Sequence, residues 1–268
     1  MRLLFPTDFS EHAKMSLDYA IHLSTLLKAE LHIIHVYQDI RPSRSLTSLK
    51  DILEEDAKRD MQTLLKSLPD DIVSSLFIKT MVTVGDVVDT VNAYARKFEI
   101  ELIMVGTKGT SNAKAVLFGS VTAKLISNTT FPVLAIPLNA SKTLEAGQLL
   151  LADDNKSIHE SDGIKLIKKM SSALDKKINL LHVKSKTDDL GADEDMEMVQ
   201  ILGQDFGELI VIDGADESME IRKYVENHDV ALLIMIKRQH SLFDKIFFKS
   251  HVKEELGQTN TPILIISE

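Results

Sequence analysis

The stretch Leu31-His32-Ile33-Ile34-His35-Val36 decides the fold class, because a close copy of it recurs later in the chain. The copy is Ile178-Asn179-Leu180-Leu181-His182-Val183. Both stretches are short and rich in Ile, Leu and Val, and neither alternates strictly with polar residues. This pattern is typical of strands that are buried on both faces of a parallel sheet. The recurrence predicts two copies of one α/β unit in tandem.

Three further pairs of segments repeat in the same order along the chain. They are Leu3 to Asp8 with Leu149 to Asp154, Leu102 to Val105 with Leu233 to Ile236, and Phe131 to Ile136 with Thr261 to Ile266. A polar stretch from Asn139 to Gly147 separates the two copies. We therefore expect one domain at residues 1–138 and a second at residues 147–268.

Longer segments with helical spacing of apolar residues lie between these strands. One follows Ser10, which is a plausible N-cap, a second follows Gly85-Asp86, and a charged third covers Ser48 to Leu68. Each copy is thus expected to contain five strands and four helices, as a Rossmann-like α/β fold with a parallel sheet and helices on both faces. In the second copy, the acidic run from Asp188 to Glu197 is interpreted as a solvated loop and a short helix.

The last strand of each copy is apolar and would aggregate if its edge stayed open. In the first copy it is Phe131 to Pro137, with a proline near each end. Pairing it with Pro262 to Ser267 would cover both edges. We therefore predict an intramolecular pseudo-dimer with a pseudo-twofold relation; the alternative is two independent domains on a linker.

Composition excludes several classes of protein. The chain has 268 residues, a net charge of −9, 44% hydrophobic residues and no Cys. A negative net charge argues against a broad nucleic-acid or anionic-membrane surface, and no apolar run is long enough to span a bilayer. Without Cys there is neither a disulfide framework nor a thiol nucleophile. These features lead us to expect a cytoplasmic protein.

The segment from Gly106 to Val121 carries the main candidate site. Gly109 follows Gly106 after two residues, and Gly119-Ser120 follows after nine more. Glycines let the backbone approach a ligand closely, and a helix that begins at Ser120 offers free N–H groups to an anion. The spacing is neither that of a P-loop nor that of a dinucleotide fingerprint. It favours a phosphate site over the alternative of a plain turn.

A second candidate is Pro6-Thr7-Asp8, at the end of the first strand. The Asp8 carboxylate can accept hydrogen bonds from ribose hydroxyls, as acidic residues do in dinucleotide sites; alternatively, it caps the helix that starts near Ser10. His32 and His35 lie on opposite faces of a strand and are interpreted as structural. The sequence contains neither a recognisable nucleophile elbow nor an acid/base pair of carboxylates, so a binding module is favoured over an enzyme.

These motifs resemble those of universal stress proteins of the tandem-domain type. The resemblance rests on Pro6-Thr7-Asp8-Phe9-Ser10, on the glycine spacing from Gly106 to Ser120, and on Phe131-Pro132-Val133-Leu134. It implies an adenine nucleotide alpha hydrolase-like sheet of order 3-2-1-4-5 that pairs through its fifth strand. It also implies ATP, with or without Mg²⁺, at the carboxyl end of the sheet.

The resemblance also assigns roles to individual residues. Asp8 would hold the ribose and adenine region, flanked by Pro6 and Thr7, while Val36 would contact adenine and Gly106 would lie against the ribose. The phosphates would be bound by Gly109, Gly119, Ser120 and Val121. The implied function is an ATP-binding protein that acts in stress response or signalling through its shape or an unknown protein partner. A slow ATPase and a nucleotide-free interaction protein remain alternatives, and further homodimerisation stays open.

The second copy departs from this pattern. Lys237 stands where the first copy has Gly106, and Lys249-Ser250 stands where it has Gly119-Ser120. Side chains at these places should block close approach to a phosphate, although Lys237, Arg238 and Lys249 could still attract an anion. We expect a single nucleotide site, in the first copy, and a degenerate second copy.

Overall fold

The chain alternates strands and helices through both halves. The computed structural model describes residues 1–38, 47–107, 119–140, 144, 146–153, 159–184, 192–238 and 260–267. The first half contains β1 (Arg2–Pro6), α1 (Glu11–Leu26), β2 (Glu30–Tyr37), α2 (Thr47–Lys66), α3 (Asp70–Ser75), β3 (Ile78–Val84), α4 (Val87–Lys97), β4 (Leu102–Gly106), α5 (Ser120–Asn128) and β5 (Val133–Ile136). The second half contains β6 (Gln148–Asp153), α6 (Asp162–Leu174), β7 (Ile178–Lys184), α7 (Ala192–Leu202), the 3₁₀ turn η1 (Gly203–Asp205), β8 (Phe206–Asp213), α8 (Glu217–Asn227), β9 (Val230–Lys237) and β10 (Ile263–Ser267).

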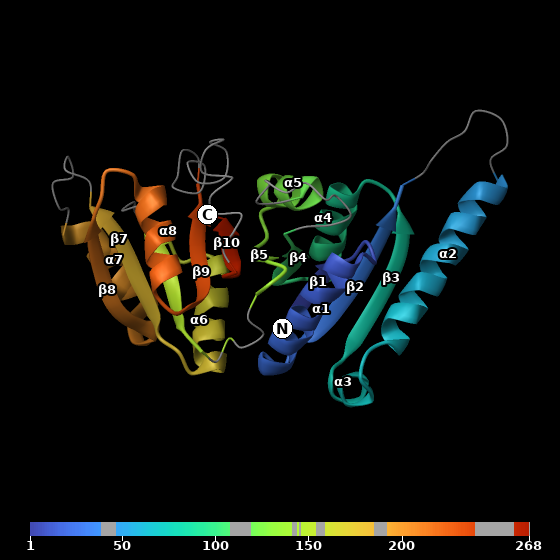
Figure 1. Ribbon diagram of the computed structural model, residues 1–268, viewed down its shortest axis with the longest axis horizontal. Helices are drawn as coiled ribbons and strands as arrows, with labels where there is room; N and C mark the ends of the chain where they lie inside the picture. Colours follow the sequence, from blue (N-terminus) through green and yellow to red (C-terminus); the bar gives the residue numbers. More distant parts are fainter. Residues whose placement is uncertain are drawn as a thin grey trace.

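The ten strands of the described residues form one continuous sheet, in the order β3-β2-β1-β4-β5-β10-β9-β6-β7-β8. Each half therefore has the expected order 3-2-1-4-5, and the two halves lie side by side with β5 and β10 between them (Figure 1). Strand pairs within each half are parallel. The doubly wound α/β fold predicted from the sequence is confirmed.

The seam between the halves is an antiparallel pairing of β5 with β10. Leu134 lies opposite Leu264, with Ile263 opposite Ala135 and Ile265 opposite Val133. All six of these side chains are buried. The predicted pseudo-twofold pairing is confirmed, and the alternative of two independent domains is wrong.

The apolar core covers both faces of the sheet and crosses the seam. Leu134 and Leu264 belong to a cluster that packs against α1, α2, α6 and α7. Val133 and Ile265 belong to the cluster on the opposite face, against α4, α5 and α8. Because successive strand residues point to opposite faces, the uniformly apolar inner strands supply both clusters.

Helix starts follow the capping rules. Ser10 caps α1 as predicted, accepting a hydrogen bond from the amide of Ala13, and Asp86 caps α4 by accepting from Val88 and Asp89. Ser161 caps α6 in the second half by the same geometry as Ser10 in the first. Equivalent caps in the two halves support the repeat independently of the strands.

Helix content differs from the prediction in one place and agrees with it in another. The first half has an extra short helix, α3, after the charged helix α2. In the second half, the acidic segment read as a solvated loop and short helix includes α7, whose Met198 and Leu202 are buried in the core. The fourth helix expected in the second half would fall within residues 239–259, outside the described part of the chain. None of the described helices combines the length and the apolar character of a membrane span.

Candidate functional site

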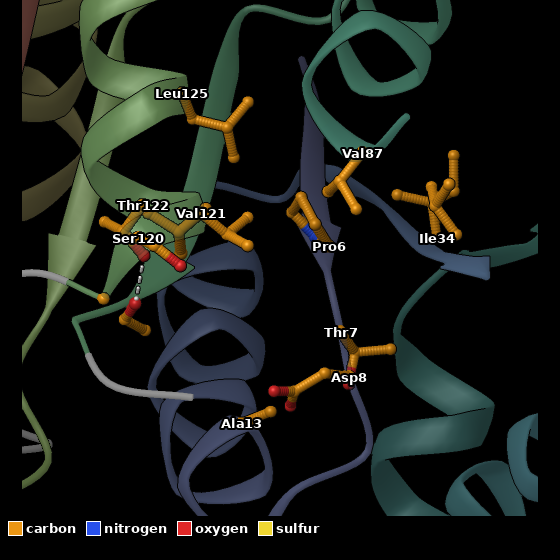
Figure 2. Close-up of a pocket in the computed structure, with 14 residues that line it drawn as sticks. Pro6, Thr7, Asp8, Ala13, Ile34, Val87, Ser120, Val121, Thr122 and Leu125 are labelled. Atoms are coloured by element: carbon orange, nitrogen blue, oxygen red, sulfur yellow. Dashed lines mark hydrogen bonds between the residues drawn. The ribbon is translucent and has the colours of Figure 1, made fainter. Parts of the chain in front are cut away.

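A pocket opens at the carboxyl end of β1 and β4, where open α/β sheets bind ligands. Its cavity volume is about 190 Å³. One side comes from Pro6, Thr7 and Asp8 after β1, and the other from Gly119 to Leu125 at the start of α5. Figure 2 shows Ser120 and Val121 on one side of this space and Pro6 and Asp8 on the other. The two segments that the sequence singled out therefore line one cavity.

Hydrogen bonds and a ring stack hold the turn that follows β1. The Thr7 amide donates to the Ile34 carbonyl over 2.9 Å, and the Phe9 amide donates to Thr7 Oγ1 over 3.1 Å. Phe9 has a positive φ of 60°, a conformation that is uncommon for a bulky residue. Its ring stacks on His35 at 4.3 Å, and His35 Nδ1 lies 2.8 Å from the Thr7 carbonyl oxygen. The surrounding contacts thus hold Phe9 in a strained conformation, as is common at ligand sites.

The Asp8 carboxylate lies at the pocket side of this turn. Its Oδ1 accepts from the Ser10 amide over 3.0 Å and from Ser10 Oγ over 2.6 Å. Ser10, rather than Asp8, accepts from the first turn of α1, so the alternative that Asp8 caps this helix is wrong. Both bonds of Asp8 use Oδ1, which leaves Oδ2 to accept from a ligand hydroxyl.

The first turn of α5 supplies hydrogen-bond donors to the pocket. Its N-cap is Gly119, which has no side chain to bind the amides that follow. Among the described residues no side chain caps them, so within this part of the chain they are open to an anion. The Gly119 amide itself donates to the Thr107 carbonyl over 2.7 Å. Thr122 Oγ1 donates to the Gly106 carbonyl over 2.8 Å, the bond drawn dashed in Figure 2. These two bonds fix the start of α5 against the end of β4.

Mainly apolar side chains line the rest of the pocket. Val36 was predicted, and the structure adds Ala13, Ile34, Val87, Val105, Thr122 and Leu125. Of these, Val87 had a usable signal, because a helix that begins directly after the third strand must start at the same edge of the sheet. Among the described residues that line the pocket, Asp8 is the one ionisable group. Within the described part of the chain, no group of three His, Cys, Asp or Glu residues is placed to bind a metal ion.

The structure brings together most of the predicted site. Pro6, Thr7, Asp8, Val36, Gly106, Gly119, Ser120 and Val121 all line the pocket. Gly109 lies outside the described residues, as do Lys249 and Ser250 of the second half.

Lys237 has a different role from the one considered in the sequence. It ends β9 as Gly106 ends β4, but its Nζ donates to carbonyl oxygens of Ile126, Ser127 and Thr129 at distances of 2.6, 2.9 and 3.3 Å. These carbonyls belong to the end of α5 in the first half. The residue that replaces the glycine therefore bridges the two halves.

The two histidines of β2 have separate structural partners, as predicted. His32 is fully buried, with Nδ1 2.9 Å from Tyr94 Oη and Nε2 2.9 Å from Glu30 Oε1. Burial lowers the pKa of His32, and this outweighs the opposing effect of the Glu30 carboxylate. The pKa of Glu30 is itself lowered, chiefly by its hydrogen bond with Lys79.

Comparison with known proteins agrees with this geometry. A family model described as the Universal stress protein family matches residues 1–137. Universal stress protein MJ0577 of Methanocaldococcus jannaschii is 29% identical over 154 residues, which cover 50% of this chain and 93% of that protein. Universal stress protein YxiE of Bacillus subtilis is 26% identical over 144 residues, covering 50% of this chain and 97% of the relative.

A solved structure matches the whole chain in fold. It is a universal stress protein from Archaeoglobus fulgidus, with 17% sequence identity and a TM-score of 0.74, covering 99% of this chain and 98% of that one. At this identity the match supports the fold alone, including its two halves. With the family match over residues 1–137 and the motifs that line the pocket, the chain belongs to the universal stress protein family.

Proposed function

We propose that this protein binds one molecule of ATP in its first half, residues 1–138, and that the second half, residues 147–268, is a degenerate copy without a nucleotide site. The observation that carries the proposal is the pocket in which Asp8 faces the uncapped first turn of α5. A carboxylate and a set of free amides suit the two polar ends of a nucleotide, its ribose and its phosphates.

The shape of the pocket favours a ligand that is ring-like at one end and anionic at the other. Its cavity volume, about 190 Å³, is below the roughly 300–1,000 Å³ of pockets that enclose a whole drug-sized ligand. A purine base would fit among the apolar side chains of Ile34, Val36 and Val87. The ribose would then lie near Asp8 Oδ2, and the phosphates would lie across the open rim at Gly119 and Ser120.

The lining residues favour binding over hydrolysis. A hydrolase needs a positioned base for water, and among the described residues of the pocket Asp8 is the single candidate. That carboxylate already accepts two hydrogen bonds from Ser10. We therefore propose a nucleotide-binding protein rather than an enzyme, one that acts in stress response or signalling through nucleotide-dependent shape or partner binding. Mg²⁺, where present, would enter with the phosphates.

Isothermal titration calorimetry with Mg-ATP tests this function. The wild-type chain should bind one ATP, with GTP as the comparison for the base. Gly119→Glu should weaken ATP binding at least tenfold, because its carboxylate would stand where a phosphate binds. A tenfold change in Kd corresponds to about 1.4 kcal/mol of binding free energy. The φ of Gly119 is −56°, so a side chain can be added without backbone strain.

A matched control adds the same charge elsewhere. Gln62→Glu lies on the exposed face of α2 and should bind ATP as the wild type does. Absence of ATP binding by the wild type would refute the proposed function, and two sites per chain would refute the degenerate second half. If the wild type releases phosphate from ATP and Gly119→Glu abolishes this release, the protein is a slow ATPase rather than a binding protein.

A further inference from the structure

The C-terminal end of α5 is completed by the second half of the chain. A helix leaves its last four carbonyls without intrahelical partners. In α5, the Thr129 amide donates to Leu125, and Asn92 Nδ2 donates to Asn128 over 3.3 Å. The remaining two carbonyls, of Ile126 and Ser127, accept from Lys237 Nζ. The second half thus supplies the donor for half of the terminal carbonyls of this helix.

The same helix begins in the pocket. Ser120, Val121, Thr122 and Leu125 of α5 line the cavity, and Lys237 binds the other end of the helix. Figure 1 shows α5 at the edge of the first half that faces β10. One short rigid element therefore connects the pocket of the first half with a side chain of the second half.

We propose that Lys237 is a positioning residue for the nucleotide site and that nucleotide binding is coupled through α5 to the contact between the two halves. This inference rests on the proposed ATP site and adds a regulatory role for the degenerate half. It also gives a reason why β9 ends in Lys237 where β4 ends in Gly106. A glycine there would suit a phosphate, whereas the lysine binds α5 of the first half.

The effect of Lys237 is one of position rather than of charge. Nine residues at 1.5 Å per residue separate the two ends of α5 by about 13 Å. That exceeds the Debye length of about 8 Å at physiological ionic strength, so the ammonium acts weakly on a phosphate at the far end. A lysine that binds three carbonyls does, however, fix where the helix lies, and small displacements of donors are costly for a phosphate site.

The coupling must act in both directions. If the contact of Lys237 with α5 strengthens ATP binding, then ATP must strengthen that contact by the same factor. Bound ATP should therefore slow hydrogen exchange at the end of β9, which carries Lys237, and in β10, which forms the seam with β5. None of the described residues of these two strands lines the pocket.

Calorimetry on Lys237 variants is the first test. Lys237→Met removes the donor and keeps the length of the side chain; it should weaken ATP binding by about fivefold or more, the lower end of typical coupling factors. Lys237→Arg keeps a cationic donor and should retain most of the affinity. Lys177→Met is the matched control, because it removes the same charge and a bond from Lys177 Nζ to the Gln204 carbonyl within the second half. It should bind ATP like the wild type.

Hydrogen exchange on the wild type is the second test, and it does not depend on how well a variant folds. Protection of residues 230–237 and 263–267 by ATP is the expected result, and Lys237→Met should abolish it. If the wild type binds ATP without such protection, or if Lys237→Met folds and binds with unchanged affinity, the coupling is refuted while the ATP site stands. If the wild type does not bind ATP, the proposed function itself fails.

Discussion

At the scale of single residues, the candidate site depends on a short turn whose side chains hold its own backbone in place. The side chains of Thr7 and Asp8 both accept hydrogen bonds from backbone amides of the same turn. Phe9 has a positive φ, and its ring stacks on that of His35. These contacts order the turn before any ligand arrives, which reduces the entropy that binding must overcome. Gly119 contributes by lacking a side chain at the start of α5.

His32 provides a test at this scale through the pH dependence of stability. Its pKa in the fold is below the unfolded value of about 6.5, because the buried ring is held neutral. The stabilisation is therefore complete above about pH 6.5 and is lost as the pH falls through the folded pKa. The free energy of unfolding of the wild type should fall more steeply between pH 7 and pH 5 than that of His32→Gln. Urea denaturation across this range measures both slopes, and equal slopes would contradict the assignment.

At the scale of elements, the proposed function depends mainly on helix termini. The N-terminus of α5 faces the pocket without a side-chain cap, whereas α1 and α6 start with serine caps. An uncapped terminus leaves donors unsatisfied, a cost that a bound anion removes. The difference between these helices separates the terminus that we propose binds phosphate from two structural ones.

The two serine caps form a matched pair for mutation. Ser10 accepts from Ala13 over 3.1 Å and Ser161 accepts from Ile164 over 3.3 Å, so Ser10→Ala and Ser161→Ala should each lower the free energy of unfolding by about 1 kcal/mol. Ser10 also holds Asp8, whereas Ser161 lies in the half without a proposed site. Ser10→Ala should therefore weaken ATP binding as well, and Ser161→Ala should not. Denaturant titration and calorimetry on the same samples separate the two effects; equal affinities would argue against a role for the Asp8 turn.

At the scale of the whole molecule, the seam turns two halves into one sheet. The fifth strands of both halves are buried on both faces, and their antiparallel pairing leaves β3 and β8 as the outer strands. The outer strands are the more exposed ones, with Leu209 and Val211 of β8 40% and 47% exposed. The most deeply buried strands thus lie inside the sheet, and the more exposed strands form its two open edges.

Leu264 tests the seam. Its side chain is fully buried opposite Leu134, so Leu264→Asp would bury a carboxylate without a partner and should cost about 3 kcal/mol or more. Leu209→Asp makes the same change on the exposed outer strand and should cost about 0.5 kcal/mol or less. Denaturation measures both, and small-angle scattering should show a larger radius of gyration for Leu264→Asp than for the wild type. Unchanged stability of Leu264→Asp would contradict the pairing of β5 with β10.

Sequence alone determined the units of this protein and most of its pocket. Recurring buried strands such as Leu31 to Val36 predicted both halves, because burial on two faces leaves a local signature of uninterrupted apolar residues. The positions of Asp8 and Gly119 at strand and helix ends then predicted one shared site, since the carboxyl ends of parallel strands meet at one edge. The seam was inferred from the need to cover apolar edges.

Tertiary structure alone decided what each side chain meets across long separations in the chain. Lys237 looked like the remnant of a ligand site, and its three carbonyl partners in α5 lie more than a hundred residues away. The burial of Met198 and Leu202 in α7 was likewise hidden by their acidic neighbours. Local patterns record which face of an element is apolar, but they carry no information on which distant group that face or side chain will contact. The contact of Lys237 that joins the two halves is therefore visible only in the folded chain.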